Sequence, residues 1–335
     1  MNDSDILRII ATNNNDEIKE LFDQARKTRE TYYGKSVFIR GLIEITNYCK
    51  NDCYYCGIRC SNSNIERYRL SQQEILNCCH SGDMLGIKTF VLQGGEDPWF
   101  TGERITQIVS AIKQKYPNHA VTLSLGERTE ADYRLFYNAG ADRYLLRHET
   151  ACASHYEKLH PPSQTLANRK QCLWTLKDIG FQVGAGFMTG SPYQTNESLL
   201  CDIRFLEELQ PQMVGIGPFM PQKDTPFGAY PSGSLELTLK MLALVRLLLP
   251  GALIPATTAL ASITHNGREL ALKAGANVVM PNLSPAAVKK LYAIYDNKAF
   301  SGAENAKNLS LIKDEIINAG FLPDMSVGDA LVINV

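Results

Sequence analysis

The sequence lacks an excess of charge of either sign. Its 335 residues carry 34 Lys and Arg against 35 Asp and Glu, which leaves a formal net charge of -1. A protein that binds a phosphate backbone over a large surface needs a basic face, so nucleic acid is not an expected partner.

Long apolar runs are also missing. The longest, around Leu242 to Leu249, is interrupted by Arg246 and is far too short to cross a bilayer. Residues 1–20 are polar and acidic, with neither the basic start nor the apolar centre of a secretory signal. We therefore expect a cytoplasmic protein with no membrane partner.

Internal repeats, low-complexity tracts and linkers are absent, which favours a single domain over residues 1–335. Helical spacing of apolar residues predicts N-terminal helices within residues 1–37. Short apolar runs then alternate with amphipathic stretches. The expected strands are 38–46, 89–93, 121–125, 143–147, 182–187, 213–217, 253–257 and 277–280. The expected helices between and after them are 71–85, 102–115, 129–138, 165–179, 195–209, 235–249, 267–274 and 284–294.

This alternation predicts parallel βαβ units, hence an α/β fold. Eight units match a (β/α)8 TIM barrel over 38–295, with 296–335 as a C-terminal extension. An open doubly wound sheet is the alternative. In a barrel, the residues that follow each strand are the candidates for an active site.

The nine cysteines are unevenly placed: four lie within residues 49–60 and none follows Cys201. Free cysteines in a reducing compartment bind metals, act in catalysis or serve as small buried groups. Cys49, Cys53 and Cys56 follow the first expected strand with C-x3-C-x2-C spacing. Three thiolates in one loop can converge on a soft metal centre.

The number of ligands limits the kind of centre. Structural zinc usually takes four ligands, yet the sequence has no second C-x-x-C and no His within twenty residues of Cys56. Three thiolates on a [4Fe–4S] cluster leave one iron open to a ligand. Cys60 is a candidate fourth ligand, so a closed, non-enzymatic iron–sulfur or zinc site stays an alternative.

A second segment, Gly94-Gly95-Glu96, follows the second expected strand. Glycines allow a close backbone approach and a carboxylate complements a cation, so the segment is a candidate binding loop. An ordinary turn is the alternative.

The pattern C-x3-C-x-aromatic-C, with Tyr55 as the aromatic, resembles the signature of the radical S-adenosylmethionine (SAM) superfamily. Residues 35–297 further resemble the HydE family, the maturases of the [FeFe]-hydrogenase active site. The phrases that carry this resemblance are 92–93, 122–127, 144–150, 215–219, 255–259 and 280–282. It implies an enzyme with a [4Fe–4S] cluster on Cys49, Cys53 and Cys56, whose open iron chelates SAM. One electron then cleaves SAM to a 5′-deoxyadenosyl radical.

The resemblance also implies roles for individual residues. Those assigned to SAM are Tyr55, Gly94, Gly95, Glu96, Ser124, Arg147, Glu149, Arg169, Met280 and Tyr292, and those assigned to substrate are Thr257, Thr258 and Tyr295. Mutual neutralisation is the alternative for Arg147 with Glu149. Ordinary packing is the alternative for Met280, Tyr292 and Tyr295.

Many HydE relatives carry three further cysteines near the C-terminus, whereas residues 295–302 contain none. We therefore expect one cluster only. The implied substrate is a small precursor of the diiron subcluster, held inside the barrel. The implied partners are an electron donor, flavodoxin or ferredoxin, and other hydrogenase maturases. A methylornithine synthase-like mutase and a biotin synthase-like sulfur inserter are the alternative enzymes.

The remaining His and Cys residues receive no chemical role. We expect His80, His119 and His265 at the surface or at helix caps, and His155 and His160 in a loop. Buried thiols are expected at Cys78, Cys79, Cys152, Cys172 and Cys201.

Overall fold

The computed structural model describes residues 1–296, 298 and 308–331. Its main sheet has six parallel strands in the order β2-β3-β4-β5-β6-β7. Their bounds are β2 Gly41–Thr46, β3 Thr89–Gly94, β4 Ala120–Ser124, β5 Arg143–Leu145, β6 Gln182–Thr189 and β7 Met213–Pro218. Each matches an expected strand.

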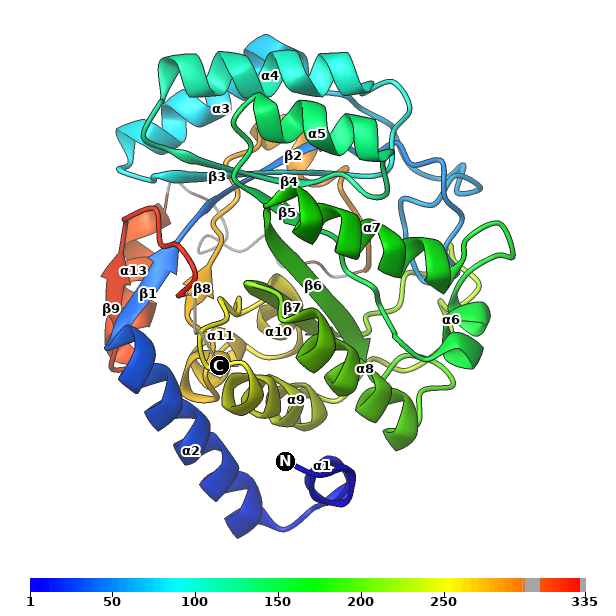
Figure 1. Cartoon of the computed structure of the whole chain (residues 1–335), viewed down its shortest axis with the longest axis vertical. Coiled ribbons are helices and arrows are strands. Elements are labelled where there is room, and N and C mark those ends of the chain that lie inside the picture. Colours follow the sequence, from blue (N-terminus) through cyan, green and yellow to red (C-terminus); the bar gives the residue numbers. More distant parts are fainter. Residues whose placement is uncertain (297, 299–307, 332–335) are drawn as a thin grey trace.

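Three further parallel pairings close the sheet into a ring. Met213 pairs with Leu253, Pro255 pairs with Val278 of β8 (Val278–Val279), and Leu42 pairs with Asn282. The expected barrel is thereby confirmed (Figure 1). The expected strand 253–257 is wrong as a regular strand, because its pairings are isolated. Pro255 has no N–H to donate, which interrupts a regular ladder there.

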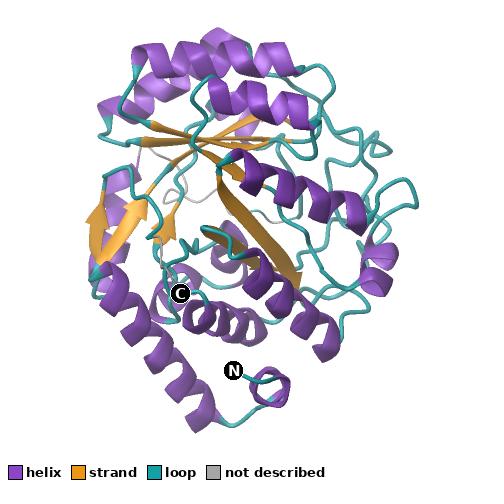
Figure 2. Cartoon of the chain, viewed as in Figure 1, coloured by secondary structure: helices purple, strands orange, loops and turns teal. Residues whose placement is uncertain are grey.

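Most of the expected helices cover the outside of the ring (Figure 2). Ser71 and Glu74 form a capping box that starts the first of them, and Thr101, Thr129 and Thr195 cap three others. Their bounds are α3 Gln72–Met84, α4 Gly102–Lys115, α5 Glu130–Asn138, α7 Leu166–Ile179, α8 Asn196–Leu209, α9 Leu235–Leu248 and α11 Gly267–Lys273.

The helix expected over 284–294 is wrong beyond its first turn, because only α12, Ala286–Lys289, forms. The carbonyl oxygens of Leu291 and Ile294 instead accept hydrogen bonds from Asn47 and Gly57 in the loop after β2. Two short helices were not expected, α6 (Ala153–Leu159) and α10 (Thr258–Ile263).

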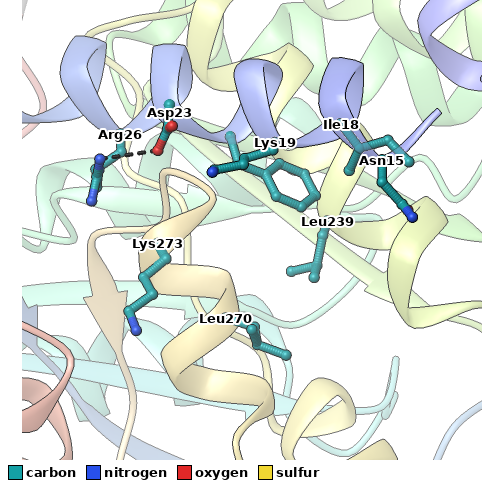
Figure 3. A pocket seen from close by; sticks show the side chains of 9 residues that line it. Asn15, Ile18, Lys19, Asp23, Arg26, Leu239, Leu270 and Lys273 are labelled. Carbon is teal, nitrogen blue, oxygen red and sulfur yellow. Dashed lines mark hydrogen bonds and ion pairs between the residues drawn. The ribbon is translucent and has the colours of Figure 1, made fainter.

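The expected N-terminal helices are α1 (Asp3–Ala11) and α2 (Asn15–Tyr33). Leu21 and Ala25 of α2 pack against Ala243 of α9. A groove runs between α2, α9 and α11, with apolar side chains inside and charged ones at its edge (Figure 3). Asp23 and Arg26 form an ion pair of 3.0 Å at that edge.

The C-terminal extension forms the floor of the barrel. Helix α13 (Leu309–Asn318) leads into β9 (Leu322–Asp324), which pairs with β1 (Ser36–Ile39). Residues 327–329 then lie against the first residues of β3 and β5. Arg143 donates to Val327 O and Asp329 Oδ1 at 3.2 and 2.6 Å, and Thr89 Oγ1 donates to Val327 O at 2.9 Å.

Candidate active site

The cysteine loop begins directly after β2, as the sequence predicts, and is tied to three neighbouring segments. The amide of Lys50 donates to Glu96 O at 2.9 Å, that of Tyr54 to Leu159 O at 3.0 Å and that of Gly57 to Ile294 O at 2.8 Å. These contacts fix the loop across the carboxyl ends of the strands, where barrel enzymes carry their chemistry.

Within this loop, Asp52 braces the turn around the cysteines. Its carboxylate accepts from Arg59 Nε at 2.6 Å and from Ser61 Oγ at 2.7 Å. Hydrogen bonding from Arg59 holds the pKa of Asp52 well below its ordinary value. The charge of Asp52 is therefore used to hold the loop.

Cys49, Cys53 and Cys56 are half-buried free thiols, whereas Cys60 is exposed. Burial raises the pKa of all three, that of Cys53 to about 12. A bound cation compensates for this cost when a thiolate becomes a ligand. In residues 1–296, 298 and 308–331, no three Cys, His, Asp or Glu side chains gather around one point as they would around a single metal ion. An iron–sulfur cluster would be held by the thiolates of these three cysteines, which need not meet at a single metal ion.

The glycines after β3 allow two loops to touch. A Cβ added to Gly95 would lie 2.2 Å from Tyr48 O and 2.8 Å from Cys49 Cβ, so only glycine fits. Gly126, with a φ of +75°, leaves room for Glu96 in the same way, since its Cβ would lie 1.7 Å from Glu96 Cγ. Gly126 was not among the predicted site residues.

Glu96 lies in a buried charged cluster with Arg169 of α7 and Glu127. Arg169 Nε is 2.7 Å from Glu127 Oε1, and Arg169 Nη2 is 3.6 Å from Glu96 Oε1. Burial by itself lowers the pKa of Arg169, but the carboxylates of Glu127 and Glu96 outweigh it and raise the pKa well above its ordinary value. Glu96 Oε2 accepts no hydrogen bond, although Lys50 Nζ is 3.4 Å away. Glu127 was not among the predicted site residues.

Arg147 and Glu149 form an ion pair of 3.1 Å, which is the neutralisation that the sequence left as an alternative. The pairing is incomplete, because Arg147 Nε and Glu149 Oε2 are buried without a hydrogen-bond partner. Glu149 has a φ of +65°, a conformation that a non-glycine residue adopts at a cost. Such strain, beside unused polar atoms, is typical of a binding segment.

His148 and Asp202 form a buried pair that holds the segment with Arg147 and Glu149 in place. Asp202 of α8 accepts from Ala151 N at 2.5 Å and lies 3.3 Å from His148 Nε2. Burial lowers the pKa of His148 and raises that of Asp202, so the pair avoids separated charges. Neither residue was predicted as a support, since their contact joins the segment after β5 to α8.

The prediction that His155 and His160 lie in a loop is wrong. His155 belongs to α6, His160 is its C-cap, and both are buried. Burial lowers the pKa of His160 to about 3, so the ring is neutral. Its Nδ1–H donates to Tyr156 O at 3.0 Å, which leaves Nε2 to accept from the Tyr55 hydroxyl at 3.1 Å. His160 therefore orients the aromatic residue of the cysteine motif.

Two other expectations are corrected. His119 is buried rather than at the surface, because it stacks on Phe90 and contacts Asp83 at 2.9 Å. Cys201 is exposed and Cys152 is half-buried, whereas Cys78, Cys79 and Cys172 are buried as expected. His80 and His265 are exposed as expected.

The remaining predicted residues surround the barrel interior at different places. Ser124 ends β4, Thr257 is the N-cap of α10, Thr258 is its first residue and Tyr295 lies beyond α12. Tyr292 is buried and accepts from Gln93 Nε2 at 3.4 Å, and Thr257 Oγ1 is buried without a hydrogen-bond partner. Met280 packs against an apolar cluster that includes Tyr33, Phe38 and Met213.

Comparison with known proteins accounts for this geometry. A model of the radical SAM superfamily matches residues 43–206, which contain the cysteine loop, Glu96, Glu149 and Arg169. The [FeFe] hydrogenase maturase subunit HydE of Thermotoga maritima is 48% identical over 278 residues, which cover 83% of this chain and 79% of the relative. The chain belongs to the radical SAM superfamily.

Other radical SAM proteins resemble it less. The 3-methylornithine synthase of Methanosarcina acetivorans is 32% identical, over 83% of this chain and 79% of the relative. The crystal structure of methylornithine synthase matches with a TM-score of 0.86 at 28% identity, and covers 96% of this chain and 94% of that chain. HydG, a maturase of the [FeFe]-hydrogenase, matches at 20% identity and supports the fold alone.

Membership makes the chain an enzyme that cleaves SAM, and the superfamily implies a [4Fe–4S] cluster and SAM as cofactors. The residues present fit both groups. Three half-buried thiols supply soft ligands. The segments beside the cysteine loop hold buried charged atoms without hydrogen-bond partners, on Glu96, Glu149 and Arg147. No helix in the described part of the chain is long and apolar enough to span a membrane.

Proposed function

We propose that this radical SAM enzyme is a HydE-like maturase that acts on a small precursor during assembly of the [FeFe]-hydrogenase diiron subcluster. The observation that carries the proposal is the 48% identity to the HydE subunit over 83% of the chain. Identity at this level, spread over the barrel, supports a shared substrate class more strongly than the fold does, because one fold hosts many functions.

Cys49, Cys53 and Cys56 are the proposed ligands of a single cluster. When bound, the cluster supplies one electron for SAM cleavage. Cys60 is proposed to stay outside the ligand set, because its thiol is exposed while the other three are half-buried. The absence of cysteines after Cys201 supports one cluster rather than two.

The charged side chains beside the cysteine loop support the proposed SAM contacts. The carboxylates of Glu96, Glu127 and Glu149 face the guanidinium groups of Arg147 and Arg169, and Lys50 Nζ lies 3.4 Å from Glu96, so charges of both signs are available to the ammonium and the carboxylate of SAM. SAM carries a net positive charge, since it has a sulfonium, an ammonium and one carboxylate. We assign Glu96 to the ammonium, Arg169 to the carboxylate and Glu149 to the ribose hydroxyls. Gly94 and Gly95 bring this segment against the cysteine loop.

Polar groups inside the barrel support a small polar substrate. Thr122 Oγ1 and Thr257 Oγ1 are buried without hydrogen-bond partners, so each can donate to a bound molecule. Tyr292 and Tyr295 are assigned to the same space, with Thr258, Ser124 and Met280 at its edges. A site inside a barrel excludes water from a reactive intermediate. Electrons are proposed to come from a flavodoxin or ferredoxin.

The first test is SAM cleavage by the reconstituted protein. The protein is loaded with iron and sulfide anaerobically, reduced with dithionite and given SAM, and 5′-deoxyadenosine is quantified. The Cys49→Ser variant serves as the control. Absence of 5′-deoxyadenosine from a protein that holds about four irons per chain would contradict the enzyme assignment.

A second candidate function is a methylornithine synthase-like mutase, favoured by the TM-score of 0.86 over 96% of the chain. Two assays on the same chain distinguish it from the maturase. One measures activation of an [FeFe]-hydrogenase produced together with the other maturases, with and without this chain. The other measures 3-methylornithine in cells that express it. Hydrogenase activation without 3-methylornithine is the expected result.

A further inference from the structure

Four side chains form a stack that leads from the cysteine loop to the surface. The guanidinium carbon of Arg69 lies 3.7 Å from the ring centre of Tyr48 and 5.7 Å from that of Trp99. The guanidinium carbon of Arg104, on α4, lies 4.1 Å from the Trp99 ring. We call Tyr48, Arg69, Trp99 and Arg104 the cation–aromatic ladder. Such contacts are favourable because a cation meets the negative face of a ring.

The inner end of the ladder is fixed to the cysteine loop. Tyr48 directly precedes Cys49, and its carbonyl lies against Gly95 so closely that a Cβ there would be 2.2 Å away. Arg69 is held by the buried carboxylate of Asp97, at 2.6 Å from Nε and 2.9 Å from Nη2. A bidentate pair with a buried partner leaves Arg69 little freedom.

The outer end of the ladder consists of Trp99 and Arg104. Both are exposed, and neither is held by a buried ion pair as Arg69 is. Trp99 is 39% exposed, whereas Glu96 and Asp97 just before it are buried. Its ring packs edge-on against the ring of buried Phe100, with the ring centres 4.8 Å apart. Arg104 donates to Trp99 O at 2.6 Å and forms no ion pair with any residue that the structure describes. An exposed Trp beside an exposed Arg is the composition typical of an energetic centre in a protein interface.

The exposed charges around Trp99 favour an acidic partner. Lys50, on the cysteine loop, has a side chain that is 54% exposed, and Arg104 is exposed. The carboxylates of Glu96 and Asp97 are buried and face Lys50 and Arg69 from within. Glu103, in the first turn of α4, is an exposed acid that borders the ladder, and Asp132 lies beside Gly102 of the same turn.

We propose that the cation–aromatic ladder is the docking site of a small acidic one-electron carrier of the flavodoxin type. The proposal rests on the proposed function, because the electron must reach a cluster on Cys49, Cys53 and Cys56. In the transfer the carrier is oxidised by one electron, the cluster is reduced by one electron, and no bond forms or breaks. Opposite charges on the two surfaces steer the encounter.

The test compares two reductants of the same reconstituted protein, a flavodoxin in its fully reduced state and dithionite. Stopped-flow absorbance follows cluster reduction at low and high salt. We expect Arg104→Glu to lower the second-order rate constant with flavodoxin at low salt by about tenfold or more. Trp99→Ala lowers it as well, and Glu103→Gln raises it. Reduction by dithionite stays within about twofold in all three variants, because that small reagent needs no docking surface.

The matched control is Arg8→Glu on α1, which changes the net charge equally at an exposed site. Arg8 has a side chain that is 60% exposed, and α1 lies at the other end of the molecule from α4 (Figure 1). The docking site is overturned if Arg104→Glu and Arg8→Glu behave alike with flavodoxin. A dithionite reaction that fails in the unmodified protein contradicts the proposed function instead. Binding of oxidised flavodoxin, measured by isothermal titration, needs no turnover and still decides the docking site.

Discussion

The two ends of the barrel use buried charge in opposite ways. At the floor, Arg143 donates to acceptors on five residues, which are Thr89, Gln182, Val327, Gly328 and Asp329. Arg40 reaches Gly328 O at 2.8 Å, and only its Nε lacks an acceptor. At the carboxyl ends of the strands, in contrast, Glu96, Arg147 and Glu149 each keep a buried atom without a hydrogen-bond partner.

The buried charges at the floor stabilise the fold, whereas those at the carboxyl ends of the strands are available to a ligand. An unsatisfied buried polar group costs free energy, so a folded chain avoids it unless a ligand completes the bonds. The floor is completed by the chain's own C-terminal extension. The upper end is left open for a charged molecule, and Glu149 in a strained conformation belongs to that end.

The largest expected effect concerns the cysteines. Cys49→Ser removes one of three proposed thiolates, and we expect loss of the cluster and SAM cleavage at the background of cluster-free protein. Cys60→Ser is the matched control, with its exposed thiol on the same loop, and should retain iron and activity. Iron content and 5′-deoxyadenosine are measured for both. Equal losses in the two variants would mean that Cys60 also binds the cluster.

The next largest effects are expected when one buried arginine is replaced at each end of the barrel, Arg143 at the floor and Arg169 at the upper end. Arg143→Met at the floor should lower the free energy of unfolding by about 2–4 kcal/mol, because several hydrogen bonds to charged groups are lost. Its affinity for SAM should stay within about twofold, since no upper-end partner changes. Chemical denaturation and SAM titration measure the two quantities.

Arg169→Met at the upper end should weaken SAM binding by about 10- to 100-fold, because the partner of the SAM carboxylate is removed. The same titration provides the comparison with Arg143→Met. If both substitutions weaken SAM binding equally, the division between a closed floor and an open binding end is wrong.

A smaller effect is expected from relief of backbone strain. Asn tolerates a positive φ better than Glu does, so Glu149→Asn should raise the free energy of unfolding of the SAM-free protein by about 0.5–1 kcal/mol. SAM affinity should fall in the same variant. Thermal unfolding with and without SAM checks both, and a variant that loses stability would show that the Arg147 contact outweighs the strain.

The smallest effect is a pH dependence of the floor. Burial tends to raise the pKa of Asp329, but hydrogen bonds from Gln182 and Arg143 outweigh it and lower the pKa below its ordinary value of 3.8. The stabilisation is therefore fully present above pH 3.8 and is lost as the pH falls through the lowered pKa. Asp329→Asn should remove this component, seen as a flatter stability profile below pH 3.8. Its side chain is 60% exposed, so the effect is small.

Sequence patterns located most of the elements and the cysteine loop correctly. They failed where distant segments compete for the same backbone groups. The 284–294 segment has helical periodicity, yet the carbonyls of Leu291 and Ile294 bind the cysteine loop instead of a helix. The 253–257 segment has the composition of a strand, but Pro255 cannot continue the ladder.

In the candidate site, too, the sequence indicated some residues but not the contacts between distant segments. The place of Gly94-Gly95-Glu96 after an expected strand indicated Glu96, and the resemblance to the HydE family implied Arg147 and Glu149. No local pattern indicated that Arg169 would pair with Glu127, that His160 would orient Tyr55, or that Gly126 would make room for Glu96. Each of these contacts joins separate segments of the chain.

The sequence by itself therefore determined the barrel, the cysteine loop and the radical SAM chemistry, because periodicity and motif spacing act over a few residues. The tertiary structure alone decided which buried charges are satisfied. It also decided that the C-terminal extension closes the floor, and that Trp99 and Arg104 lie beside the cysteine loop. These outcomes depend on contacts between residues far apart in the chain, which no local pattern records.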